Sequence, residues 1–161
     1  MWLLLKNALF TILVPGTVAV FVPLSAFRHG DIEWSRRCVP ASVLLCVGAS
    51  IYFWCLWDFA VSGRGTPAPI DPPKELVVRG LYRVSRNPMY VGVLAVIAGW
   101  ALLFGEWSIA LYGGAVGLAF TLFVLGYEEP HLTRVFGTAY TDYCARVGRW
   151  WTIRRRKRAD G

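Results

Sequence analysis

The apolar and polar positions along the chain divide it into long uncharged blocks separated by charged segments. Four windows of 19 to 21 residues contain no Asp, Glu, Lys or Arg: Asn7–Phe27, Cys38–Trp57, Asn87–Gly105 and Trp107–Tyr127. A helix rises about 1.5 Å per residue, so each window can cross a hydrocarbon core of roughly 30 Å. Because backbone groups in lipid must pair within their own segment, the pattern predicts four membrane-spanning helices.

The composition also favours an integral membrane protein. Of the 161 residues, 56% are hydrophobic, and the mean hydropathy is +0.47, which is above that of a typical soluble domain. The first window could instead be a cleaved secretory signal. Its positive flank is Lys6 alone, however, and three more apolar windows follow, which favours a retained helix.

The basic residues are unevenly placed and predict an orientation. The net charge is +7, with five Lys or Arg between Arg64 and Arg86, eight after Tyr127, and three in the loop 28–37. The positive-inside rule then puts the two richer segments, and with four spans both termini, in the cytoplasm. The basic run Arg154–Arg158 is typical of an anchor to anionic membrane lipids rather than of nucleic-acid binding.

Turn signals divide the chain further. The Gly- and Pro-rich stretch SGRGTPAPIDPP separates two spanning helices, residues 1–61, from the remainder, residues 62–161. Asp58 is expected to mark the cytoplasmic interface of the second helix. Gly105-Glu106-Trp107 is expected to be a tight turn joining an antiparallel transmembrane hairpin, residues 87–127. Five glycines suit close helix contact in lipid: Gly92, Gly99, Gly113, Gly114 and Gly117.

The character of the chain changes after Tyr127. Apolar or aromatic residues recur at roughly helical spacing, with Gly137 expected to interrupt them: Leu132, Val135, Phe136, Tyr140, Tyr143 and Val147. This spacing predicts a cytoplasmic amphipathic helical cap. The predicted fold is thus an all-α integral membrane protein with about four transmembrane helices and a C-terminal cap.

Glu128 and Glu129 stand at the end of the fourth apolar window. Two carboxylates at a helix C-terminus oppose the helix dipole, so their placement is locally unfavourable. They either mark where the membrane stops, paired with Arg134 or Arg146, or hold a polar or cationic ligand.

The stretch RGLYRVSRNPMYVG precedes the third window and allows two interpretations. Arg83 and Arg86 can be positive-inside anchors, whereas Asn87-Pro88 fits a helix start with Asn as the cap and Pro at the first position. A capped helix N-terminus leaves backbone N–H groups free for an anion. The four cysteines form no C-x-x-C pair and the two histidines lie in different segments, so we expect no metal site.

Two distant segments together resemble a known enzyme group. KELVVRGLYRVSRNPMYVG and YEEPHLTRVFGTAYTDYCARVGRWW are similar to the isoprenylcysteine carboxyl methyltransferase and phospholipid methyltransferase family of membrane enzymes, over about Lys74 to Trp151. The resemblance implies S-adenosylmethionine as the cofactor and a small lipophilic or lipid-like acceptor that enters from the bilayer. The compactness of this half leads us to expect a bacterial plasma membrane.

The resemblance also assigns residues. It implies a cytoplasmic cofactor pocket formed by Lys74, Glu75, Leu76, Val77, Tyr82, Arg86, Asn87, Pro88, Met89, Tyr90 and Glu128. No catalytic base is evident, and Glu129, Tyr140 and Tyr143 are candidates by location alone.

The chain departs from the family pattern at three positions. Lys74 and Asn87 stand where the family often has His, and Val124 stands where the prenylcysteine enzymes are expected to have an Arg that meets the substrate carboxylate. Val124 argues against a prenylcysteine carboxylate as the acceptor. Two alternatives stay open: a sterol-reductase-like oxidoreductase that binds NADPH, and a non-catalytic membrane protein that retains the fold. The acceptor and the oligomeric state are not determined.

Overall fold

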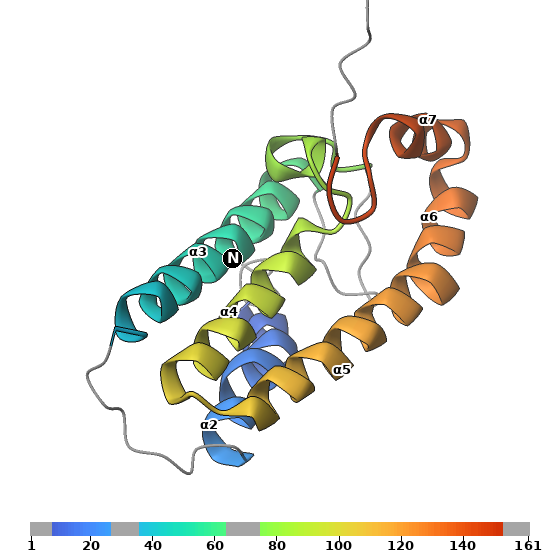
Figure 1. The fold of residues 1–161 in the computed structure, drawn as a ribbon. Helices are drawn as coiled ribbons and strands as arrows, with labels where there is room; N and C mark the ends of the chain where they lie inside the picture. Colours follow the sequence, from blue (N-terminus) through green and yellow to red (C-terminus); the bar gives the residue numbers. More distant parts are fainter. Residues whose placement is uncertain (1–7, 27–35, 64–74, 153–161) are drawn as a thin grey trace, which may run out of the picture.

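The computed structural model describes residues 8–26, 36–63 and 75–152, and within these ranges every regular element is helical (Figure 1). The elements are η1 (Ile12–Phe21), α2 (Val22–Ala26), α3 (Cys38–Asp58), η2 (Phe59–Gly63), η3 (Gly80–Arg83), α4 (Pro88–Phe104), α5 (Trp107–Phe123), η4 (Val124–Glu128), α6 (Glu129–Phe136) and α7 (Thr138–Arg146). Ser62 and Gly63 of the predicted linker still belong to η2, and the rest of that linker lies outside the described residues.

Three described helices are long and apolar enough to cross a bilayer: Ala8–Ser25, Cys38–Val61 and Trp107–Phe136. The fourth, α4, is apolar but has 17 residues, the lower end of the length a spanning helix needs. The all-α prediction is therefore confirmed for the described residues, whereas the count of four spans and the division at residue 62 stay predictions.

Helices α3 and α4 lie side by side and approach closely at two facing glycines (Figure 1). A Cβ atom on Gly48 would lie 2.7 Å from the carbonyl oxygen of Gly92, and one on Gly92 would lie 2.8 Å from the carbonyl oxygen of Gly48. Gly99 is equally close to Leu45. Small residues let backbones approach in lipid, and here they set the separation of the two helices.

The prediction of close contact therefore holds for Gly92 and Gly99. A Cβ atom on Gly113 would lie 3.1 Å from the Ile97 side chain of α4, and one on Gly117 would lie 3.6 Å from that of Leu94. A Cβ atom on Gly114 would have no neighbour within 4 Å, so the prediction was wrong there.

We expect Gly48→Leu to destabilise the bundle by about 1–3 kcal/mol, because the new side chain must push α3 away from α4. Gly114→Leu is the matched control, since it makes the same change in helix propensity at a position with open space. Thermal unfolding in detergent, followed by circular dichroism, compares the two. Equal melting temperatures would contradict the close packing.

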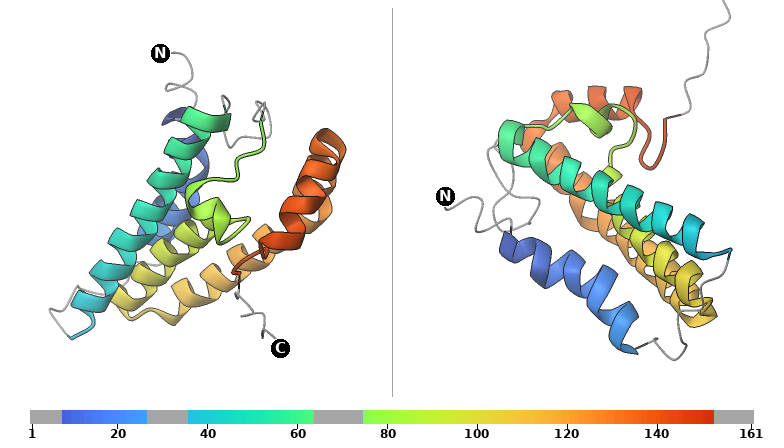
Figure 2. Two further views of the ribbon diagram at one scale, coloured as in Figure 1. Left: turned by 90° about the horizontal axis from the view of Figure 1, so that it is seen from above. Right: turned by 90° about the vertical axis from the view of Figure 1, so that its left-hand side faces the viewer.

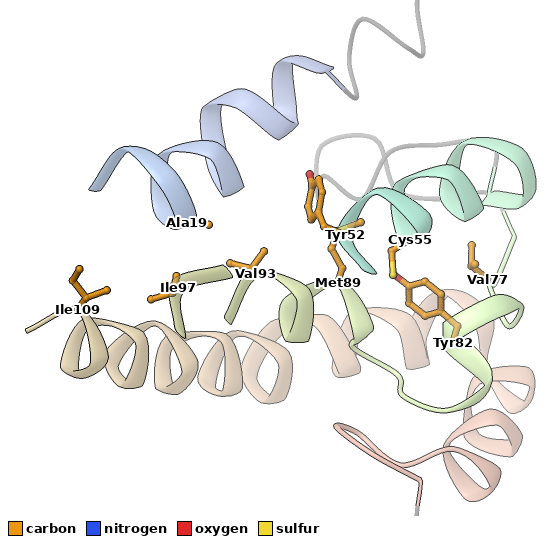
Figure 3. Packing of buried hydrophobic residues seen from close by; sticks show 9 residues of the cluster. All are labelled: Ala19, Tyr52, Cys55, Val77, Tyr82, Met89, Val93, Ile97 and Ile109. Carbon is orange, nitrogen blue, oxygen red and sulfur yellow. The ribbon is translucent and has the colours of Figure 1, made fainter. Parts of the chain in front are cut away.

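The first apolar helix, Ala8–Ser25, contains η1 and is called the first helix below. The buried core joins this helix to α3, α4 and α5 (Figure 3). Ala19, Val93 and Ile97 belong to its centre, and Tyr52 and Cys55 lie nearer the η3 end. The first helix is also fixed by polar contacts: the hydroxyls of Thr11 and Tyr52 share a 2.9 Å hydrogen bond, and Tyr112 donates to the carbonyl oxygen of Val18 at 2.9 Å.

The predicted hairpin is confirmed, but its second helix runs further than expected. Gly105 ends α4 with φ +67°, and α5 begins at Trp107. From there α5, η4 and α6 form one continuous helix of 30 residues, Trp107–Phe136, about 45 Å long against a hydrocarbon core of roughly 30 Å (Figure 1). Glu128 and Glu129 lie within this helix, so the expectation that they stand at its C-terminus was wrong.

The helix ends at Gly137, which has φ +54°, as the sequence predicted. α7 then turns back, and α6 and α7 lie at the same end of the bundle as η3 (Figure 2, right). Tyr140, Tyr143 and Val147 of this cap are buried against Leu76 and Leu132. The helical cap is thus present, and its cytoplasmic side stays a prediction.

Candidate functional site

A cavity of about 430 Å³ lies where the cap meets the bundle. Its wall takes residues from the first helix, η2, the segment 76–90, the long α5–α6 helix and α7. Of the residues predicted to bind the cofactor, seven line it: Leu76, Val77, Tyr82, Arg86, Asn87, Tyr90 and Glu128. The three catalytic candidates line the same cavity: Glu129, Tyr140 and Tyr143.

The other predicted cofactor residues lie elsewhere. Glu75 is exposed and does not line the cavity. Pro88 and Met89 are buried in the first turn of α4, with Met89 in the helix core, so their side chains support the fold rather than the cavity wall. Lys74 lies outside the described residues.

Glu128 lines the cavity and is held there by a hydrogen bond. Tyr90, in the first turn of α4, donates a hydrogen bond to Glu128 Oε2 at 2.9 Å. Glu128 Oε1 has no hydrogen-bond partner among the described residues. The Tyr90 ring also packs on Phe120, with centroids 4.5 Å apart, which fixes the tyrosine in place. A carboxylate oxygen of this kind, in a cavity wall, suits an ammonium or hydroxyl group of a ligand.

Glu129 forms a three-residue ion cluster with two arginines. Arg149 Nε donates to Glu129 Oε1 at 2.7 Å and Arg149 Nη2 to Oε2 at 2.9 Å, a bidentate pair. Arg86 Nη1 lies 3.1 Å from Oε1 and also donates to Cys144 Sγ at 2.7 Å. The side chain of Arg86 is only 12% exposed, so its interpretation as a surface anchor was wrong.

The predicted partners of the glutamates were also wrong. Arg134 and Arg146 donate instead to backbone carbonyls one turn earlier in their own helices, at Pro130 and Asp142. Both arginines are exposed and form no ion pair with the glutamates. The arginines that reach Glu129 come from distant parts of the chain.

Asn87 is not the side-chain cap of α4 that the sequence suggested, although Pro88 does occupy the first turn. Its Nδ2 donates to the carbonyl oxygen of Arg149 at 3.1 Å. Arg86 N donates to the carbonyl of Gly148 at 3.0 Å, and Thr152 N to that of Val84 at 2.8 Å. These bonds tie the segment before α4 to the segment after α7 and close one side of the cavity.

Both tyrosine candidates are buried, and their rings contact one another. The hydroxyl of Tyr143 donates a hydrogen bond to the carbonyl oxygen of Tyr82 at 2.7 Å. Burial raises the pKa of Tyr82, of Tyr140 and of Tyr143, so all three hydroxyls keep their protons at neutral pH. Protonated hydroxyls suit packing and orientation rather than proton removal. Glu129, the third catalytic candidate, is paired with the guanidinium groups of Arg86 and Arg149.

A buried carboxylate fixes the loop that carries Tyr82. Asp58, at the end of α3, is 1% exposed and accepts from Arg79 Nε, which lies 3.1 Å from Oδ1. A Cβ atom on Gly80, which has φ +56°, would collide with Asp58 Oδ2. Asp58 therefore supports η3 through contacts with Arg79 and Gly80, and its place at the membrane interface stays a prediction.

The apolar wall of the cavity was missed by the sequence reasoning. Phe10 and Val14 come from the first helix, and Phe123 and Val124 from the long helix. Apolar residues in a spanning helix carry no local sign of lining a cavity. His131 was missed as well, although its position three residues after Glu128 places both on one helix face.

One family model matches the chain, that of phospholipid methyltransferase, over residues 37–139. No curated protein and no solved structure matches. The matched range contains the α4–α5 hairpin, both glutamates and the segment from Leu76 to Tyr90, and it leaves out the first helix.

The match covers well over half of the chain, and three apolar helices of spanning length agree with a multi-pass membrane protein. The family is one of methyltransferases, and the segments that carry the resemblance meet around one cavity. The chain therefore belongs to the phospholipid methyltransferase family.

Proposed function

We propose that this protein is an S-adenosylmethionine-dependent membrane methyltransferase that methylates a small lipophilic acceptor. The observation that carries the proposal is the cavity itself, in which Glu128 and Arg86 lie on a wall shared with apolar side chains of two membrane-spanning helices. A site for a charged cofactor and a lipophilic acceptor needs both kinds of wall in one place.

The residues present fit the cofactor. S-adenosylmethionine would supply an electrophilic methyl group on a sulfonium, beside an ammonium, a carboxylate and a ribose. Glu128 Oε1 can accept from the ammonium or a ribose hydroxyl. Arg86 Nε is buried with no hydrogen-bond acceptor among the described residues, which suits the carboxylate. The faces of Tyr90 and Phe120 suit a cation.

The protein's own contribution is mainly positioning and exclusion of water. Holding two reactants in line lowers the entropic part of the barrier, and no metal ligand set is needed for this step. Phe10, Val14 and Phe123 offer an apolar surface to the acceptor, and Val124 offers it no positive charge. These features support a lipophilic acceptor that enters from the bilayer.

The orientation of the protein belongs to the same proposal. Arg86, before α4, lines the cavity, and Arg149, after α7, pairs with Glu129 of its wall, so the cavity lies beside described basic residues of both segments. The positive-inside rule therefore favours a cytoplasmic cavity and cytoplasmic termini. We place the protein in a bacterial plasma membrane with anionic lipids as neighbours, as part of the same proposal.

Calorimetric titration of the purified protein in detergent tests the proposal. We expect saturable binding of S-adenosylmethionine with a micromolar dissociation constant, and no binding of NADPH. Binding of NADPH instead would assign the protein to the reductase alternative. Binding of neither by folded protein would contradict the proposed function and favour the non-catalytic alternative.

A further inference from the structure

His131 is a cavity residue to which neither the fold nor the cofactor gives a role. It stands on the long helix, three residues after Glu128 and four after Tyr127, and all three line the cavity. Its ring stacks on that of Tyr127, with centroids 5.7 Å apart and planes 5° from parallel. The stacking fixes the plane of the imidazole.

The nitrogens of His131 form no hydrogen bond or ion pair with any described residue. The other polar side chains that line the cavity are engaged differently. Glu129 is bound by Arg86 and Arg149, and burial raises the pKa of Tyr140 and of Tyr143, so these two hydroxyls retain their protons. Glu128 already accepts from Tyr90 and is the residue assigned to the cofactor. The imidazole of His131 is therefore the basic group that this wall leaves available.

We infer that His131 is the general base of the reaction and that the acceptor is consequently a protic nucleophile, a thiol or amine on a lipophilic body. The inference rests on the proposed function. In the balanced reaction, a lone pair of the acceptor's sulfur or nitrogen forms the new bond to the methyl carbon. The carbon–sulfur bond of the sulfonium breaks with its electrons on sulfur, leaving a thioether. The acceptor's proton passes to His131 and then to water.

The apolar wall agrees with this acceptor class. A carboxylate acceptor needs no base, but it needs a positive group to hold it in a water-free site. Val124, 1% exposed, supplies none where it faces the cavity, and Arg86 is engaged by Glu129 through Nη1 and assigned to the cofactor's carboxylate through Nε. A thiol or amine can enter in its neutral form and lose its proton only as the methyl group transfers.

The first test follows His131 directly and does not depend on turnover. The full chain carrying His29→Gln is labelled with [¹³C]histidine, so that His131 gives the remaining histidine signal, and is saturated with S-adenosylhomocysteine. We expect dodecanethiol to shift that signal saturably and dodecanoate to leave it in place. An unchanged signal with dodecanethiol and dodecylamine, or a shift with dodecanoate alone, would overturn the inference.

The second test measures transfer of a tritiated methyl group from S-adenosylmethionine to dodecanethiol or dodecylamine. His131→Ala is expected to lower the rate by about 100-fold or more, the usual contribution of a general base, and added imidazole is expected to restore part of it. His29→Ala is the matched control and should behave as the wild type. A His131→Ala variant with the wild-type rate, or one whose rate imidazole does not restore, would contradict the role of His131 as the general base.

The proposed function and the role of His131 are tested by different outcomes. S-adenosylmethionine that does not bind the wild-type protein would remove the proposed function. S-adenosylmethionine that binds wild type and His131→Ala equally, together with methylation of dodecanoate, would leave the proposed function standing and overturn the role of His131.

Discussion

Replacement of Glu129 by alanine is expected to lower the free energy of unfolding by about 2 kcal/mol, between the loss for an exposed ion pair and that for a fully buried one, because the Glu129 side chain is 19% exposed. The variant leaves Arg86, 12% exposed, without the carboxylate that compensates its charge. Arg149 is 34% exposed and can turn toward water, so most of the cost falls on Arg86.

The same change should loosen the closure of the cavity. Glu129 joins the long helix to Arg86, before α4, and to Arg149, after α7, and these two segments also share backbone hydrogen bonds. Without the carboxylate, the two guanidinium groups repel one another across the place it occupied. We therefore expect S-adenosylmethionine binding to weaken along with stability.

Thermal unfolding in detergent measures this effect, with Asp142→Ala as the matched control. Asp142 is an exposed carboxylate on α7 whose side chain makes no interaction within the described residues, so its loss should change stability by less than about 0.5 kcal/mol. A Glu129→Ala protein with the same melting temperature as the wild type would show that the ion cluster contributes no stability.

Replacement of Glu128 by alanine is expected to weaken S-adenosylmethionine binding by about 10- to 100-fold with little loss of stability. A hydrogen bond to a charged group is worth about 1.5–3 kcal/mol, and each 1.4 kcal/mol is about a tenfold change in affinity. The variant removes the one carboxylate oxygen that the protein leaves free in the cavity. Glu128→Gln keeps the side chain's size and its bond from Tyr90, so it isolates the charge.

Calorimetric titration measures the effect, and Glu106→Ala is the matched control. Glu106 stands at the turn between α4 and α5, away from the cavity lining, and should leave the affinity unchanged. Tyr90→Phe should weaken binding less than Glu128→Ala, because the tyrosine orients the carboxylate rather than meeting the ligand. Equal affinity of Glu128→Ala and wild type would exclude Glu128 from the cofactor site.

Local signals were enough to predict much of the fold. The uncharged windows gave the apolar helices, because a helix in lipid must satisfy its backbone within one segment. Gly105 and Gly137 were read correctly as ends of helices, since both adopt positive φ, which glycine tolerates best. The order of the motif residues likewise predicted seven of the residues that line the cavity.

The extent of the long helix could not be read from the chain. Glu128-Glu129-Pro130 has the composition of a helix end, and a proline usually interrupts the hydrogen bonds of a helix. Here the turn before it, η4, adopts the wider π pattern, which accommodates the backbone adjustment that the proline requires. The continuous helix carries both glutamates and His131 along one wall of the cavity.

The sequence by itself determined that this protein is helical and apolar, where its hairpin turns, and which family motifs it carries, because each of these is encoded in neighbouring residues. Only the tertiary structure decided which charges are buried. Arg86 looks like a surface residue in the sequence, and it can line the cavity at 12% exposure because Glu129 compensates its charge. The apolar wall has the same origin, since Phe10 and Val14 face the cavity only when the first helix packs against the others.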